Sequence, residues 1–389
     1  MSVQLRIVNQ EPPVQPVASP AWLGYGFRPF FLGAALVAPL LMLLWVAEVV
    51  HGLPVSHATS SLQWHGHEMI YGFVTCVVAG FLLTAVPNWT GLPTPRGWAL
   101  GALFLLWSLP RVGMLIKAPA LLPVTAILDL AFLPCLAVVL AIPLVRAHKP
   151  NNLVFVPILL CLTAGNACFW SDILGYSPGT APLSKQLGIG LILLLIGIIG
   201  GRVIPFFASR AIHGLETRSY QPIELLSAPC LIGAMIFDHP LLAVLAGVVH
   251  LVRLYGWSHR DLWRHPLLWV LYVSYAFLGM GFLLKAAVGP VLALHAHTVG
   301  CISVMILGMM ARVALGHSGR ELKPAPLIVG AFALMSLAGL TRVFLPLLVP
   351  SAYLWWLAVS GCLWAVAFVS YAFIYIPILV SPRADGKPG

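Results

Sequence analysis

Charged residues are scarce in this chain. Asp, Glu, Lys and Arg make up 8% of the 389 residues, whereas 60% of the residues are hydrophobic. Because about a quarter of the residues of a typical soluble domain are charged, this composition excludes that class and predicts an all-α, polytopic membrane protein. Apolar windows long enough to cross a bilayer recur along the sequence. We expect twelve transmembrane helices, near residues 29–50, 65–88, 97–116, 120–145, 152–173, 186–207, 223–238, 239–256, 266–288, 291–314, 326–347 and 351–380.

Acidic residues are fewer still, 11 against 21 Lys and Arg. With twelve spans, only five of these 21 basic residues fall on one side of the membrane: Arg111, Lys117, Lys185, Lys285 and Arg342. The positive-inside rule then places both termini in the cytoplasm, and it explains the basic excess without a nucleic-acid partner. The sequence divides into an N-terminal cytoplasmic arm (1–28), a transmembrane domain (29–380) and a cytoplasmic tail (381–389). Uncleaved insertion is expected, because the first apolar segment has no small-residue cleavage site.

Paired cysteines are absent from the sequence. The seven cysteines lie singly in apolar segments, and no two of them have CxxC spacing. This pattern excludes a disulfide framework and an iron–sulfur motif, and it predicts a packing role for the thiols.

Internal similarity relates three of the predicted helices. The segment that begins at His65 aligns with the segment that begins at His295, and Gly201-Arg202-Val203 aligns with Ala311-Arg312-Val313. These segments belong to the second, tenth and sixth helices, each four helices from the next. We therefore expect three direct four-helix pseudo-repeats.

Two histidine pairs, His65-Gly-His67 and His295-Ala-His297, open the second and tenth predicted helices. Histidines at membrane depth are costly and are typical of cofactor sites or ion paths. Residues i and i+2 point about 200° apart on an α-helix, so each pair is expected to serve two centres rather than one. Neutral imidazole suits copper and haem iron. Glu68, one turn from His65, would orient a ligand histidine or relay protons.

A second polar group is predicted at the opposite end of these helices and comprises Arg202, Arg312, His317 and Arg320. The arginines would neutralise haem propionates or an anionic substrate, or else anchor helix ends to phospholipid headgroups. His317 is a further candidate metal ligand. His250, which lies deep in the eighth predicted helix, is another. Asp129 and Asn166 are intramembrane polar residues for which the sequence offers no partner.

The chain resembles the NnrS family over essentially its whole length. The segments that carry this likeness are Trp64-His-Gly-His-Glu-Met-Ile-Tyr-Gly-Phe73, Gly80-Phe-Leu-Leu-Thr-Ala-Val-Pro-Asn-Trp-Thr-Gly91, Gly200-Gly-Arg-Val-Ile-Pro205 and Gly316-His-Ser-Gly-Arg320. The resemblance implies a multi-pass protein of the bacterial inner membrane that contains haem (haem b) and copper. It also implies a link to nitric oxide, nitrosative stress and denitrification.

A weaker likeness is to the catalytic subunit of haem–copper oxidases. That subunit also has twelve helices in three four-helix arcs, with a His-x-x-x-Met segment in its second helix, matched here by His65 and Met69, and a His-x-His pair in its tenth. Carried over by position, His65 and His297 would hold one haem and His295 a second. The sixth-helix histidine–tyrosine segment of the oxidases is missing, which leaves His67 and His250 as candidate copper ligands.

The sequence therefore favours a haem–copper membrane protein that binds or turns over nitric oxide and limits nitrosative damage. It leaves open whether the protein is an oxidoreductase acting on nitric oxide, a store or a sensor, and sustained reduction would need an unidentified electron donor. The alternative from another class is a membrane transporter for a small anion, a metal or haem. In a transporter the histidines and Glu68 would line the passage, with Arg202 and Arg312 at its mouth. A purely structural helical bundle would leave the paired histidines unexplained.

Overall fold

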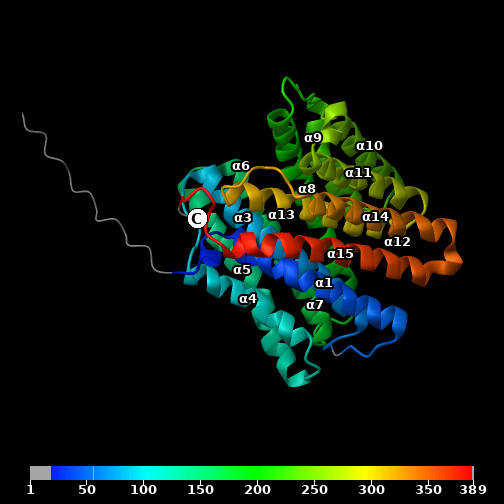
Figure 1. The fold of residues 1–389 in the computed structure, drawn as a ribbon. Helices are drawn as coiled ribbons and strands as arrows, with labels where there is room; N and C mark the ends of the chain where they lie inside the picture. Colours follow the sequence, from blue (N-terminus) through cyan, green and yellow to red (C-terminus); the bar gives the residue numbers. More distant parts are fainter. Residues whose placement is uncertain (1–18, 56, 388–389) are drawn as a thin grey trace, which may run out of the picture.

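The computed structural model describes residues 19–55 and 57–387, and this part of the chain is helical without a single strand (Figure 1). Nine of its helical segments are long and apolar enough to cross a membrane, and three are shorter apolar helices. The helices are α1 (Phe27–His51), α2 (Ser61–His67), η2 (Glu68–Val74), α3 (Thr75–Thr90), α4 (Trp98–Met114), α5 (Leu122–Arg146), α6 (Pro150–Leu153), α7 (Phe155–Ile173), α8 (Ala181–Ala211), α9 (Gln221–Ile236), α10 (Pro240–Gly256), α11 (Pro266–Ala287), α12 (Pro290–His295), η5 (Ala296–Ser303), α13 (Val304–His317), α14 (Pro326–Leu348) and α15 (Tyr353–Val380). Short 3₁₀ turns are η1 (Ala21–Leu23), η3 (Pro119–Leu121), η4 (Arg260–Arg264) and η6 (Pro350–Ala352).

The polytopic all-α architecture expected from the sequence is confirmed. α2, η2 and α3 form one continuous segment, as do α12, η5 and α13, so that twelve segments match the twelve predicted spans. The closely spaced pair around Asp238 is also present, because α9 ends at Ile236 and α10 begins at Pro240. Most of the predicted cytoplasmic arm, residues 1–18, lies outside the described residues, as do the last two residues of the tail.

The helices are arranged as three groups of four around a centre. The fourth helix of each group packs against the first helix of the next group: α5 against α7, α10 against α11, and α15 against α1. Figure 1 shows the last of these contacts, with α15 in red beside α1 in blue. The contact pattern is that of three direct four-helix repeats closed into a ring, as the internal similarity indicated.

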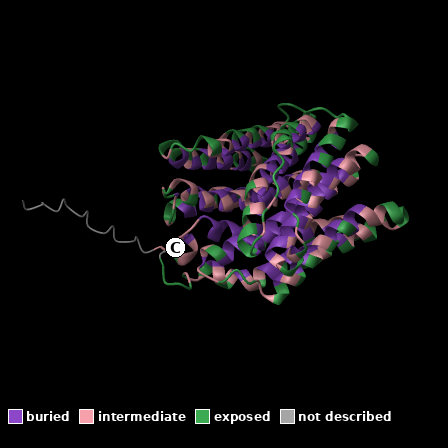
Figure 2. Cartoon of the chain, turned by 90° about the horizontal axis from the view of Figure 1, so that it is seen from above, coloured by how far each residue is buried: buried purple, intermediate pink, exposed green. Residues whose placement is uncertain are grey.

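The second helix of each group lies at the centre of the ring. α3 contacts α13, and α8 contacts both η2 and η5. The apolar window of Pro290–His317 is 89% buried, whereas that of the peripheral Pro350–Val380 is 44% buried, and the buried residues gather in the interior (Figure 2). A small apolar cavity of about 80 Å³ separates the three central helices, lined among others by Val77, Ile196 and Met309. The histidine pairs therefore sit on the two central helices whose ends meet near one end of the bundle.

A π-helical turn lies at each histidine pair. In the first central helix the turn is η2, which starts one residue after His67; in the third it is η5, which contains His297. The corresponding helix of the middle group, α8, has no such turn. π-turns are rare and concentrate at functional sites, because the extra residue in the turn re-aims the side chains around it. The two turns lie at equivalent positions of the first and third repeats, which indicates a functional site at these positions.

Candidate functional site

His65 and His295 line one cavity of about 490 Å³ between the first and third repeats. The walls come from α1, α2–η2, α8, α12–η5, α14 and α15. The lining is mainly apolar and includes Met42, Met69, Ile70, Phe73, Ile189, Leu294, Leu357 and Trp364. Sites for organic cofactors are typically apolar cavities of about 300–1,000 Å³ with a few convergent polar groups, and this cavity has that character.

The imidazole of His295 is anchored through one of its two nitrogens. Nδ1 lies 2.8 Å from the carbonyl oxygen of Val291, one turn earlier in α12. Since the carbonyl can only accept, Nδ1 carries the proton, and Nε2 is left with a lone pair. Metal-binding histidines are commonly fixed in this way by a backbone carbonyl. His295 therefore has the geometry of a ligand that presents Nε2 to the cavity.

His65 is held by stacking instead of by hydrogen bonds. Its ring lies flat on the indole of Trp45, with ring centroids 4.2 Å apart and an interplanar angle of 11°. Nδ1 is buried and has no hydrogen-bond partner within the described part of the chain. A buried polar atom without a partner is costly and calls for an explanation. The described residues therefore leave the hydrogen-bonding capacity of Nδ1 of His65 unused.

Two cations, Arg342 and Lys185, also line this cavity. Arg342 is 7% exposed; its Nη2 donates to the hydroxyl of Tyr353 (2.8 Å), while Nη1 is buried and has no acceptor among residues 19–55 and 57–387. A buried guanidinium with a free donor is suited to a carboxylate or another anion. The sequence indicated no role for Arg342 or Lys185 beyond their place among the five basic residues on one side of the membrane. The signal was nevertheless present, because Arg342 is the only charged residue between Pro326 and Leu348.

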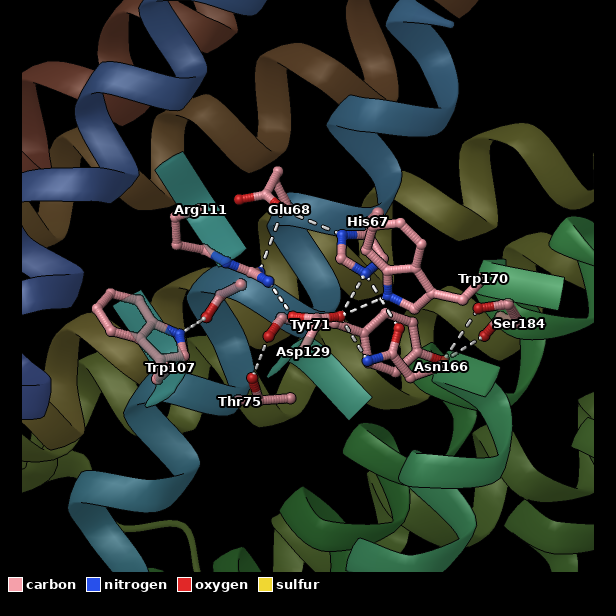
Figure 3. Close-up of polar contacts among 11 residues, drawn as sticks. His67, Glu68, Tyr71, Thr75, Trp107, Arg111, Asp129, Asn166, Trp170 and Ser184 are labelled. Atoms are coloured by element: carbon pink, nitrogen blue, oxygen red, sulfur yellow. Dashed lines mark hydrogen bonds and ion pairs between the residues drawn. The ribbon is translucent and has the colours of Figure 1, made fainter. Parts of the chain in front are cut away.

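His67 points away from this cavity into a buried polar cluster (Figure 3). Its Nδ1 lies 3.0 Å from Oε1 of Glu68, and its Nε2 lies 3.1 Å from Oδ2 of Asp129 and 3.0 Å from Oδ1 of Asn166. Both ring nitrogens are therefore engaged by protein groups. Glu68 contacts His67 rather than His65, so the predicted interaction between Glu68 and His65 is not formed.

Arg111 and Trp170 complete the cluster. The Arg111 guanidinium bonds Asp129 and lies 3.2 Å from Oε1 of Glu68, and the indole of Trp170 donates to Oδ2 of Asp129 (2.8 Å). All these groups are 5% exposed or less. Two carboxylates face one guanidinium and one imidazole, so the cluster is neutral when His67 is protonated. Such a cluster joins the first central helix to α4, α5 and α7 and gives Asp129 and Asn166 the partners that the sequence did not reveal.

His297 occupies the equivalent outward position in the third repeat but has different neighbours. Its Nε2 lies 3.3 Å from the carbonyl oxygen of Leu278, and its ring packs on Phe282, with centroids 4.6 Å apart. His297 does not line the cavity of His65 and His295. The structure thus agrees with the expectation that each pair splits between two sides of its helix. It differs in the partnership, because His65 shares its cavity with His295 and not with His297.

The remaining candidates are far apart. His250 lines a separate cavity with Arg202, described below. Arg312 lies over the ring of Phe207, 3.7 Å from its centroid, and His317 packs beside Phe27. Neither Arg202 nor Arg312 lines the cavity of His65 and His295. Across the residues that the structure describes, no three His, Cys, Asp or Glu side chains gather as a metal site.

Comparison with known proteins identifies the family. The profile of the NnrS protein family matches residues 21–383, nearly the whole chain. A search of curated proteins finds no match. The match includes both histidine pairs, both π-turns and every wall of the cavity between the first and third repeats. The chain therefore belongs to the NnrS family, a family of nitric-oxide-related membrane proteins.

Proposed function

We propose that the cavity between the first and third repeats would hold one haem b, with His295 and His65 as the residues that hold its iron, and that the protein binds nitric oxide there. The observation that carries this proposal is the cavity itself, where one anchored imidazole and one stacked imidazole from two central helices meet within apolar walls. Binding of nitric oxide at this site would limit nitrosative damage in the membrane.

The residues present fit a haem. A porphyrin needs an apolar slot with nitrogen ligands, and its carboxylates need cations at the edge of that slot. The cavity offers Nε2 of His295, the unpartnered imidazole of His65, and the free Nη1 of Arg342 with Lys185. In this proposal Arg342 and Lys185 take the role at the propionates that the sequence suggested for Arg202 and Arg312.

The two histidines have different roles because they are held differently. The Val291 carbonyl fixes the tautomer and orientation of His295 and increases the basicity of Nε2, which suits a permanent ligand. His65 is stacked on Trp45 and has no hydrogen bond to Nδ1 within the described residues, which suits an exchangeable ligand. A haem iron held by these residues would supply the centre for nitric oxide binding.

Copper is expected from the family, but the described residues do not assemble a site of three protein ligands for it. His67 has both nitrogens engaged, and His250, His297 and His317 are in separate places. We therefore assign no step to copper. No electron-donor site is assigned either, so the proposal concerns binding of nitric oxide and not a complete catalytic cycle.

The proposal is tested with the purified protein in detergent, by absorption spectra of the oxidised and reduced forms and by iron and copper analysis. We expect haem bands that shift when nitric oxide is added. His295→Ala should lower the iron content about tenfold or more, and His65→Ala should keep haem but change its bands and bind nitric oxide more tightly. His297→Ala is the matched control and should leave the bands unchanged.

Two results would overturn this assignment. Loss of haem from His297→Ala together with a normal spectrum for His295→Ala would restore the ligand pair suggested by the oxidase likeness. A folded wild-type protein without iron or colour would reject the haem site, and the transporter alternative would then be tested by flux measurements with small anions, metals and haem.

A further inference from the structure

A second, polar cavity of about 240 Å³ lies between α8, α9 and α10. Its lining includes Glu224, Ser227, His250, Arg253 and Arg202, and it shares no residue with the cavity of His65 and His295. A cavity of this size is several times the volume that one water molecule occupies. The polar lining is unexpected between apolar helices and has no part in the haem proposal.

A chain of hydrogen bonds fixes the tautomer of His250. Nη1 of Arg253 donates to the hydroxyl oxygen of Tyr275 (3.0 Å), which lies 2.9 Å from Nδ1 of His250. Because arginine only donates, the Tyr275 oxygen accepts from Arg253, and Nδ1 of His250 is the acceptor that the described residues offer to the Tyr275 proton. When Tyr275 donates to Nδ1, the proton of the neutral imidazole resides on Nε2.

Nε2 of His250 is a buried donor without an acceptor. The residue is fully buried, and Nε2 meets no acceptor with hydrogen-bond geometry in the described structure. A donor in this state suits a ligand that accepts hydrogen bonds. It does not suit a metal ion, which needs a lone pair on Nε2.

The charges around the cavity favour an anion. Glu224 pairs with Arg253 through both carboxylate oxygens, so these two charges cancel. Arg202 has no carboxylate partner among the described residues; its Nη1 donates to the amide oxygen of Asn152 (2.9 Å) and its Nη2 to the carbonyl oxygen of Asn151 (3.4 Å). The lining therefore carries one net positive charge when His250 is neutral. Arg202 is exposed and the Glu224 side chain is 30% exposed, so this side of the lining reaches the protein surface.

We propose that this cavity is a binding site for a small monovalent oxyanion, of the chemistry of nitrite, that accepts a hydrogen bond from Nε2 of His250 beside Arg202. Gly201 is part of the same construction, because a Cβ at this position would collide with the guanidinium of Arg253. Because Gly201 has no side chain, Arg253 can reach Tyr275 and form the hydrogen-bond chain that orients Nε2 of His250.

Calorimetric titration of the purified haem-containing protein with sodium nitrite tests the proposal, with the haem bands recorded at each point. We expect saturable binding that leaves the haem bands unchanged. His250→Gln places an amide donor near the position of Nε2 and should keep the affinity within about threefold, whereas the shorter His250→Asn should weaken binding about tenfold or more. Arg202→Gln should also weaken it. The control is His239→Gln, at an exposed histidine at the start of the same helix.

Equal affinity for nitrite in His250→Gln, His250→Asn and the wild-type protein would overturn the proposal, as would the absence of saturable binding. Nitrite binding that occurs only with a shift of the haem bands would place the anion at the other cavity and also overturn it. Competition by added phosphatidylglycerol would support the site and identify a lipid phosphate as its occupant, and no competition would identify a free anion. Equally strong binding of chloride would reject the preference for an oxyanion.

Discussion

The two histidine pairs share a backbone arrangement but not an environment. In both, the first histidine faces the common cavity, the second faces outward, and a π-turn accompanies the pair. His67, however, enters a buried cluster of two carboxylates and a guanidinium, whereas His297 meets a backbone carbonyl and the ring of Phe282. The repeat therefore determines where a histidine points, and the neighbouring helices determine what it can do.

This difference gives the two histidine pairs different roles in the same fold, one in stability and the other in ligand binding. Charge gathered around His67 ties α4, α5 and α7 to the first central helix, at a place where no ligand is needed to satisfy the imidazole. The third repeat has no such cluster, and its anchored histidine, His295, faces the cavity. We infer that the first repeat contributes rigidity to the site and the third contributes its strongest ligand.

The largest effect is expected when the charge cluster is broken. Asp129→Asn removes a carboxylate from the buried Arg111 and His67, and it should lower the free energy of unfolding by about 3–5 kcal/mol, because an uncompensated buried charge is costly. Thermal or denaturant unfolding in detergent measures this. Adding Arg111→Met to the Asp129→Asn variant should recover part of the loss.

The control for that experiment is Asp261→Asn. Asp261 pairs with Arg264, whose side chain is 83% exposed, and such surface pairs contribute about 0–1 kcal/mol. If Asp129→Asn costs no more than Asp261→Asn, the cluster is hydrated in the membrane and the contrast between the two histidine pairs is lost.

A smaller effect on stability, and a more direct comparison of the two pairs, is expected when each outward histidine is replaced by leucine. His67→Leu leaves Asp129, Asn166 and Glu68 each without one partner and should cost about 1–3 kcal/mol of unfolding free energy. His297→Leu breaks one 3.3 Å contact with a backbone carbonyl and should cost about 0.5 kcal/mol. Equal losses in the two variants would show that His297 has a partner comparable to the cluster around His67.

Hydropathy and helix geometry were enough to predict the twelve spans and the split of each histidine pair, and internal similarity was enough to predict the three groups of four. The spans and the split follow from local composition and from the 3.6-residue period, and both act within a single helix. The predicted break between α9 and α10 around Asp238 is also confirmed, because a proline in the first turn, here Pro240 after His239, is a local sequence signal for the start of a helix.

Contacts between side chains of different helices could not be predicted from composition and periodicity. Whether His65 meets His295 or His297 depends on how the central helices are rotated about their axes, and the π-turns η2 and η5 contribute to that rotation. A π-turn has no clear sequence signal, and so Glu68 was expected beside His65 although it contacts His67. Arg342 was overlooked because its value depends on a cavity that only the assembled helices form.

The smallest expected effect comes from the residue between the histidines, which is Gly66 in the first pair and Ala296 in the second. A Cβ at Gly66 would meet nothing within 4 Å, and alanine is favoured over glycine inside a helix by about 0.5–1 kcal/mol. Gly66→Ala should therefore raise the free energy of unfolding by up to that amount and leave the absorption spectrum unchanged. Gly281→Ala is the contrasting variant: its Cβ would collide with the ring of His297, so this substitution should destabilise the protein. Because Gly66 also lines the cavity, a loss of haem from Gly66→Ala would mean that the bound group presses on this backbone. The two pairs would then differ also in how closely the bound group approaches the backbone between the histidines.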